Sequence, residues 1–352
     1  MRIAADIMGA DNPPEEIIAG VIDAVNSYAL DVLIVGDEKK IYPALEKLSF
    51  DSKKVSVLHA PEHVGMHDSP TEIFRTKKNA SIIVAARAVR DKKADALYSP
   101  GNTGATLAAV LMTGGRVKGV ARPAIVSFLP TATGETCLLL DVGANPDCKP
   151  SYLLQFAVMG EVIAHSILGI KTPRIGLLSN GEEKEKGNEL IRTVHRELEK
   201  IPVNFIGNIE GEDILGGNVD VTITDGFTGN AVLKTMEGTL KSVLRMLRTE
   251  INRGIISKAG GLMLKPAFRK LKERIDPGQY GGAPLVGTNI TCIVGHGSSV
   301  ASEVSRGLLT AKNFLQYNVN DAIAHSLKEY KIMKMHLVWE DTIVPSSPVD
   351  EV

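Results

Sequence analysis

This sequence has few cysteines and almost no net charge. Its three cysteines are scattered, without the paired spacing of a disulfide framework or a structural zinc site, and this usage is typical of a reducing compartment. The formal net charge is −1, which argues against a protein that binds nucleic acid over its whole surface. No apolar run approaches the roughly 18–20 residues that a membrane-spanning helix needs. The chain starts with a strand at Ile3–Ala5 rather than a signal region, so we expect a cytoplasmic protein.

The marks of several catalytic classes are also missing. No Gly-x-Gly-x-x-Gly follows the first strand, so the dinucleotide fingerprint is absent there. No spacing of His, Asp and Glu suggests a metal site. Cys137 and Cys292 fall in apolar strands and Cys148 has no His nearby in sequence, which argues against a thiol nucleophile. We therefore expect no cofactor and no metal.

Short apolar strands alternate with helical segments along most of the chain. Strands followed by helices indicate a parallel sheet with helices on both faces, and 44% hydrophobic residues suffice for a substantial core. We predict a three-layer α/β/α, Rossmann-like fold with a mostly parallel sheet. A single catalytic domain is expected over residues 1–316, followed by a C-terminal helix near 325–335 and a loose tail within 317–352. The predicted strands are 3–5, 32–35, 55–59, 95–99, 124–129, 136–142, 174–179, 203–207, 219–224 and 291–295.

Three strands lead into similar glycine-containing turns and then into helices. The clearest turn is Asp225-Gly-Phe-Thr-Gly-Asn230, and related turns stand at Pro100–Ala105 and His296–Ser299. Backbone N–H groups and a helix N-terminus at such a turn attract anions. Carboxyl ends of parallel strands gather at one edge of a sheet, so we expect the turns to meet there and hold a phosphate-bearing ligand. Helix capping by the Thr and Ser side chains is the plainer alternative.

Other polar residues also follow predicted strands. Asp6–Asp11 and Asp141–Asn145 are two such strand ends, and a charged loop over 180–188 is a third. Charged loops are often simply solvated, but Lys186 lies beside Gly187, which lets the backbone come close. Backbone donors, amides and one Lys suit the binding of an anion and the stabilisation of developing negative charge.

The segment 239–275 is the basic exception in a nearly neutral chain, with ten Lys and Arg against two Glu. Its apolar residues recur at helical spacing on both sides of Gly260-Gly261, which predicts a protruding amphipathic helical hairpin. An apolar stripe with a cationic flank can lie on an anionic membrane, and it can equally form a dimer interface. The residues expected in this role are Leu240, Leu244, Leu247, Ile251, Leu264, Phe268 and Leu271.

Eight short motifs together resemble the bacterial phosphate acyltransferase family of phospholipid synthesis. They run in order from Met1 to about residue 312, and several of them together make the resemblance specific. It implies transfer of a fatty acyl group from acyl carrier protein to inorganic phosphate, and a fold similar to isocitrate and isopropylmalate dehydrogenases and to phosphotransacetylases. It also implies a homodimer, peripheral membrane association and a membrane acyltransferase that passes the acyl group to glycerol 3-phosphate. The motifs are Met8-Gly-Ala-Asp11, Ser99-Pro-Gly-Asn-Thr-Gly104, Leu139-Leu-Asp-Val-Gly-Ala-Asn145, Lys186-Gly187, Asn204-Phe-Ile-Gly-Asn208, Asp225–Asn230, Tyr280-Gly-Gly-Ala-Pro284 and His296-Gly-Ser-Ser299.

The same resemblance implies roles for individual residues. The family's catalytic Lys and Asn fall on Lys186 and Asn230. The sequence departs from the family at Ala10, where a Gly is usual, and at Ser179, where an Asn is usual. The expected phosphate and substrate contacts are Asp6, Gly9, Gly101, Asn102, Thr103, Gly104, Asp141, Asn145, Asp225, Gly226, Thr228, Gly229, His296, Gly297, Ser298 and Ser299.

Two other functions remain open from the sequence. A phosphotransacetylase-like enzyme acting on acyl-CoA would share the architecture and chemistry. A non-catalytic anion-sensing module would use the basic hairpin at a membrane.

Overall fold

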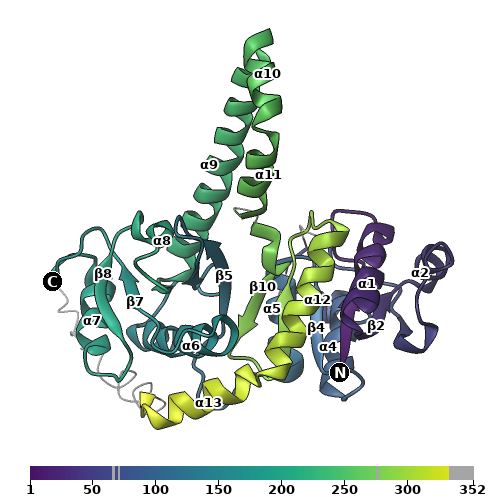
Figure 1. Ribbon diagram of the computed structural model, residues 1–352. Helices are drawn as coiled ribbons and strands as arrows, with labels where there is room; N and C mark the ends of the chain where they lie inside the picture. The colour runs from purple at the N-terminus through teal and green to yellow at the C-terminus, as the bar shows by residue number, and fades with distance from the viewer. Residues whose placement is uncertain (66–67, 70–71, 275–276, 333–352) are drawn as a thin grey trace, which may run out of the picture.

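The computed structural model describes residues 1–65, 68–69, 72–274 and 277–332 (Figure 1). The predicted end of the hairpin at Ile275 and the tail from residue 333 onwards lie outside these residues. Within them, all ten predicted strands are present, with bounds that differ by at most two residues from the prediction. The strand Ala283–Val286 was not predicted.

All the strands belong to one sheet of eleven, in the order β3-β2-β1-β4-β11-β10-β5-β6-β9-β7-β8. Seven of its ten neighbouring pairs are parallel, so the prediction of a mostly parallel sheet is confirmed. The strands are β1 (Arg2–Asp6), β2 (Asp31–Gly36), β3 (Val55–His59), β4 (Ala96–Ser99), β5 (Ala124–Pro130), β6 (Thr136–Leu140), β7 (Ile175–Leu178), β8 (Phe205–Ile209), β9 (Val221–Ile223), β10 (Ala283–Val286) and β11 (Thr291–Val294).

The sheet reverses its direction near the middle. β10 is antiparallel to both β11 and β5, and β5 is antiparallel to β6. Consequently β6, β7, β8 and β9 run opposite to β1–β4 and β11, and the two halves form lobes on either side of the hairpin (Figure 1). The prediction that all three glycine turns follow strands of one direction is wrong. The turn after β9 belongs to the opposite-running half.

Helices cover both faces of the sheet, as a three-layer fold requires. α1 begins at Pro14, whose fixed φ suits the first turn of a helix. Two acidic residues follow it in that turn, where their negative charge is favourable near the positive end of the helix dipole. One face is covered by α1 (Pro14–Tyr28), α2 (Glu38–Leu45), α6 (Pro150–Leu168), α7 (Glu189–Leu198), α12 (Ala301–Gln316) and α13 (Val319–Glu329). The other is covered by α3 (Ile73–Thr76), α4 (Ser81–Arg90), α5 (Thr103–Gly114), α8 (Asp213–Gly216) and the start of α9 (Gly226–Asn252).

Two of the helices need a comment. α6 is the one helix of the described residues that is long and apolar enough to cross a membrane, but 72% of its apolar window is buried inside the protein. α13 begins at Val319, earlier than the predicted 325, because Val319, Ile323 and Leu327 form an apolar stripe that packs into the main core.

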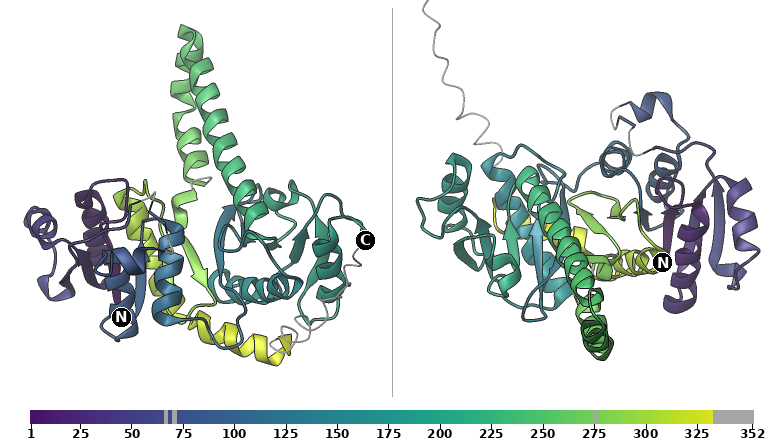
Figure 2. Two further views of the ribbon diagram at one scale, coloured as in Figure 1. Left: turned by 180° about the vertical axis from the view of Figure 1, so that it is seen from behind. Right: turned by 90° about the horizontal axis from the view of Figure 1, so that it is seen from above.

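The predicted hairpin is built from the later part of one helix and from two further helices, and it stands clear of both lobes (Figures 1 and 2). They are α9, α10 (Ile255–Met263) and α11 (Lys265–Arg274). At its base, the Tyr280 ring stacks on Phe128 of β5 with 3.9 Å between ring centroids. Ile251 of α9 packs against Gly261 of α10, where an added Cβ would lie 2.4 Å from Ile251. Leu264, Leu247 and Leu271 are exposed, whereas Leu240, Leu244, Ile251 and Phe268 are half-buried.

Candidate active site

The turns after β1, β4 and β11 lie together, since these three strands are neighbours in the sheet. The Asp11 N–H donates to the Gly297 carbonyl over 2.8 Å. Gly9 and Gly101 approach so closely that a Cβ on Gly9 would lie 3.2 Å from Gly101 Cα. We call this set, Asp6, Gly9, Gly101–Gly104 and His296–Ser299, the first group.

Asp6 is the buried acid of the first group, with 1% of its surface exposed at the end of β1. Ser99 Oγ donates to its Oδ2 over 2.9 Å, and the Met8 N–H donates to Oδ1 over 3.1 Å. Burial raises the pKa of Asp6, against the opposing effect of these hydrogen bonds. Burial therefore disfavours the charged carboxylate relative to an exposed Asp.

The start of α5 offers open backbone donors. Asn102 caps the helix through its Oδ1, which accepts from the Ala105 N–H over 3.0 Å, so the cap is neutral. Within the described residues, the N–H groups of Gly101, Thr103 and Gly104 donate to no protein acceptor. Such a set of N–H groups at a helix N-terminus, without a carboxylate, suits an anion.

The turn after β11 is more fully occupied by protein groups. His296 Nδ1 accepts from the Ser298 N–H over 3.2 Å and also contacts Ser298 Oγ at 2.8 Å, so this ring nitrogen stabilises the turn. At the start of α12, the Ala301 N–H donates to the Glu16 carboxylate over 2.9 Å. The Ser299 carbonyl accepts from the Asn12 side chain over 2.8 Å. Asn12 and Glu16 were missed in the sequence because both contacts span almost the whole chain.

The remaining candidates form a second group at the ends of β6, β7 and β9: Asp141, Asn145, Lys186 and Asp225–Asn230. Asp225 caps α9, since its carboxylate accepts from the Thr228 N–H and from Thr228 Oγ1, each over 2.8 Å. The Gly226 N–H donates to the Asn145 carbonyl over 2.8 Å. A carboxylate therefore already occupies the N-terminus of α9, where the sequence suggested an anion.

Asp141 organises the second group from inside. It is fully buried, and its carboxylate accepts five hydrogen bonds from the N–H groups of Ile125, Gly143, Ala144 and Asn145 and from the Asn145 side chain, over 2.7–3.2 Å. Gly226 and Gly229 pack directly on Asp141, where a Cβ on Gly229 would lie 2.0 Å from its carbonyl oxygen. Both oxygens of the Asp141 carboxylate are thus bonded to protein N–H groups, most of them in the 143–145 loop.

The two candidate catalytic residues are exposed at the surface of the second group. Asn230 lies beside Gly143 and is the fifth residue of α9, which begins at Gly226. Lys186 lies in the loop between β7 and α7, with its aliphatic stem against Gly181. A hollow of about 510 Å³ in the second group is lined from three strand ends, and neither Lys186 nor Asn230 is among its lining residues. These are Pro146, Asp147, Cys148, Asn188, Leu190, Asp225, Phe227 and Thr228.

In the part of the chain that the structure describes, the second group has one thiol, Cys148, beside it. Burial, and then the nearby Asp141, raise the pKa of Cys148 to about 12, so the thiolate is disfavoured. Among the described residues, no group of three or more His, Cys, Asp and Glu side chains is placed to hold a metal ion.

Comparison with known proteins gives one consistent answer. A model of the family described as "Fatty acid synthesis protein" matches residues 1–322. The chain is 44% identical over 333 residues to a phosphate acyltransferase of Leptospira biflexa, covering 94% of this chain and 98% of that protein. It is 45% identical over 332 residues to a phosphate acyltransferase of Pelotomaculum thermopropionicum, covering 94% and 96%. A solved phosphotransacetylase from Streptococcus pyogenes has a TM-score of 0.60 at 17% identity, covering 90% of this chain and 94% of that chain, which is a likeness in fold.

Proposed function

The chain belongs to the fatty acid synthesis protein family and is a phosphate acyltransferase, and from this premise we propose that it moves a fatty acyl group from acyl carrier protein to inorganic phosphate. A phosphate oxygen attacks the thioester carbonyl carbon, the C–S bond breaks, and the carrier's thiol leaves with a proton. The products are acyl phosphate and free carrier thiol.

The observation that carries this proposal is the difference between two helix starts. α9 is capped by the Asp225 carboxylate, whereas α5 has a neutral Asn102 cap and open N–H groups at Gly101, Thr103 and Gly104. An anion can take the α5 position without displacing a protein carboxylate. We place inorganic phosphate there, beside Asp6.

Lys186 and Asn230 are proposed to stabilise the charge that develops during transfer. The Lys186 ammonium attracts the phosphate and offsets negative charge on the tetrahedral oxyanion or on the leaving sulfur. The Asn230 amide donates a hydrogen bond to the same developing charge. Positioned donors of this kind each contribute about 10²–10³ in rate.

The reversal of the sheet does not separate the two groups as far as a flat sheet would. Adjacent strands are rotated by roughly 20–25°, so five steps from β4 to β9 add roughly 100–125°. Because the two halves run in opposite directions, the angle between the directions of β4 and β9 is then roughly 55–80° rather than 180°. We propose that both groups face one site between the two lobes.

The hairpin is proposed to bring this site to a membrane surface and to take part in a homodimer. Its end carries exposed apolar side chains, with Ile256 88% and Met263 83% exposed, above a basic flank. Such a surface suits an anionic bilayer. Acyl phosphate, a lipid-soluble product, would be released there to a membrane acyltransferase acting on glycerol 3-phosphate.

The experiment follows acyl phosphate by mass spectrometry with acyl carrier protein thioesters and inorganic phosphate. Lys186→Ala and Asn230→Ala should each lower turnover by about 10²–10³ in a folded protein. Lys184→Ala is the matched control, since Lys184 lies in the same loop and forms an exposed ion pair with Glu199. Near-normal turnover in both variants would exclude the proposed residues. Turnover of acetyl-CoA but of no carrier thioester would identify a phosphotransacetylase-like enzyme instead.

A further inference from the structure

The loop that carries Lys186 is held by a side chain from another strand. Asn208 on β8 is 5% exposed, and its Nδ2 donates to the Glu183 carbonyl over 2.8 Å. The same carbonyl accepts from the Lys186 N–H over 3.0 Å. One carbonyl therefore joins Asn208 to the backbone of Lys186.

The orientation of Asn208 is fixed by these partners. A carbonyl can only accept, so the amide nitrogen must face Glu183 and the amide oxygen must face away. That oxygen, Oδ1, lies 2.9 Å from Nδ1 of His195 on α7. His195 Nδ1 must then carry the hydrogen, which sets the tautomer of the neutral ring.

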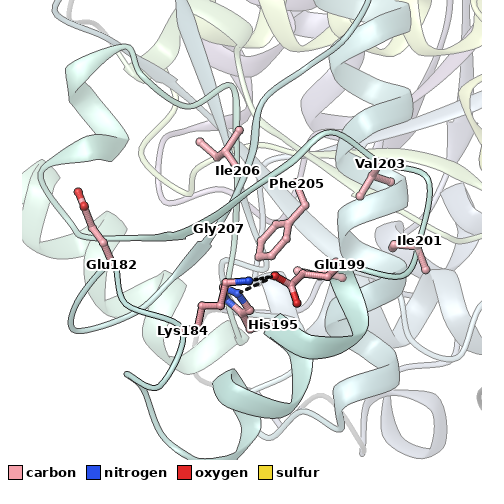
Figure 3. Close-up of a pocket in the computed structure, with 10 residues that line it drawn as sticks. Glu182, Lys184, His195, Glu199, Ile201, Val203, Phe205, Ile206 and Gly207 are labelled. Carbon is pink, nitrogen blue, oxygen red and sulfur yellow. Dashed lines mark hydrogen bonds and ion pairs between the residues drawn. The ribbon is translucent and has the colours of Figure 1, made fainter.

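His195 is itself held firmly. It is 3% exposed, and its ring meets Phe205 edge to face with 5.1 Å between centroids. Its Nε2 lies 3.7 Å from the Glu199 carboxylate, which also contacts Lys184. These side chains line a hollow of about 490 Å³ at the β8 edge, where His195 and Lys184 both point at Glu199 (Figure 3).

The rest of the loop is fixed at its two ends. Asn180 Oδ1 accepts from the Gly187 N–H over 2.8 Å, and Asn188 caps α7 through the Ile191 N–H over 3.0 Å. Gly187 has φ +89°, and a Cβ there would lie 2.6 Å from Ile191. With both ends fixed, the Asn208 contact determines where the middle of the loop, and hence Lys186, lies.

We propose that Asn208 and His195 are positioning residues that hold the Lys186 ammonium in its working place. The proposal rests on the catalytic role of Lys186 given above. It assigns a function to Asn208 of the Asn204–Asn208 motif, which phosphate binding does not explain. Neither residue needs to touch the substrate.

A double-mutant cycle tests the proposal with the acyl phosphate assay. Asn208→Ala should lower kcat about 10-fold in the wild-type background, because a misplaced catalytic group loses part of its effect. In the Lys186→Ala background the same change should alter kcat less than 2-fold, since the ammonium that it positions is gone. An equal fold loss in both backgrounds, or no loss in either, overturns the proposal. Normal turnover of Lys186→Ala alone would instead refute the catalytic assignment on which it rests.

A second pair of variants guards against a simple folding defect. His195→Asn keeps a donor near the Nδ1 position and should retain more turnover than His195→Leu, which removes it. Equal turnover of the two would count against the positioning role. Asn204→Ala is the matched control: its side chain makes one long contact of 3.5 Å to the Thr172 carbonyl, and the change should leave kcat unaltered. Thermal unfolding of each variant shows whether it is folded at the assay temperature.

Discussion

Gly229→Ala is the substitution that most directly tests the packing of the second group. Gly229 lies in the first turn of α9, and a Cβ there would lie 2.0 Å from the Asp141 carbonyl oxygen and 2.9 Å from Thr224 Cγ2. The first of these neighbours is backbone, and Asp141 is held in place by five hydrogen bonds to its carboxylate. Either the start of α9 or the 141–145 loop must therefore move.

The same helix offers a matched control in Gly238→Ala. Gly238 is exposed, and a Cβ there would meet nothing within 4 Å. Replacing Gly by Ala in a helix interior stabilises by about 0.5–1 kcal/mol at both positions. Overpacking costs about 1–3 kcal/mol at Gly229 alone. We expect Gly238→Ala to be more stable than Gly229→Ala by about 2 kcal/mol, the middle of these ranges.

Calorimetric unfolding measures this difference, which corresponds to a separation in Tm of roughly 3 °C for a domain of this size. Gly229→Ala should also lower turnover by up to about 10²-fold, because it shifts the helix that carries Asn230. If the two variants unfold at the same temperature with equal turnover, α9 does not start against Asp141 as described. A loss of stability in Gly229→Ala with normal turnover would show that the packing of Gly229 on Asp141 is not needed for the proposed role of Asn230.

Three further outcomes follow from the structure. Asp141→Asn should lower the free energy of unfolding by about 3–5 kcal/mol, because an NH₂ group then faces donors from Asn145, and calorimetry measures the loss. The Tm of Asp6→Asn relative to the wild type should rise as the pH rises above about 4: burial raises the pKa of Asp6 above its usual value of 3.8, so the folded state is favoured at low pH and loses that advantage as the pH rises through the folded pKa. Met263→Glu should weaken sedimentation with anionic vesicles, whereas Met112→Glu, which changes an exposed Met away from the hairpin, should not.

The candidate residues could be selected from the sequence because they follow predicted strands. Asp6, Asn102 and Asp225 all stand where a short apolar run gives way to glycine and polar residues, and the structure places all three at or just after a strand end. Their individual tasks could not be predicted. Whether a carboxylate caps a helix, as Asp225 does, or accepts from a distant backbone, as Glu16 does, depends on contacts across the chain.

The direction of the strands was predicted less well than their positions, although part of the information needed was present in the local sequence. β5 and β6 are joined by residues 131–135, which include Gly134, with no helix between the strands. Such a short connection joins antiparallel strands, since a parallel pair needs a crossover of a dozen or more residues. The reversal of direction between β5 and β6 could therefore have been predicted from this short connection. What no local pattern indicates is β10: it follows the whole α9–α11 excursion and pairs with β5, more than 150 positions earlier in the chain. That non-local pairing joins the two halves of the sheet. It therefore decides that the proposed phosphate-binding groups and the candidate catalytic residues come from strands of opposite direction.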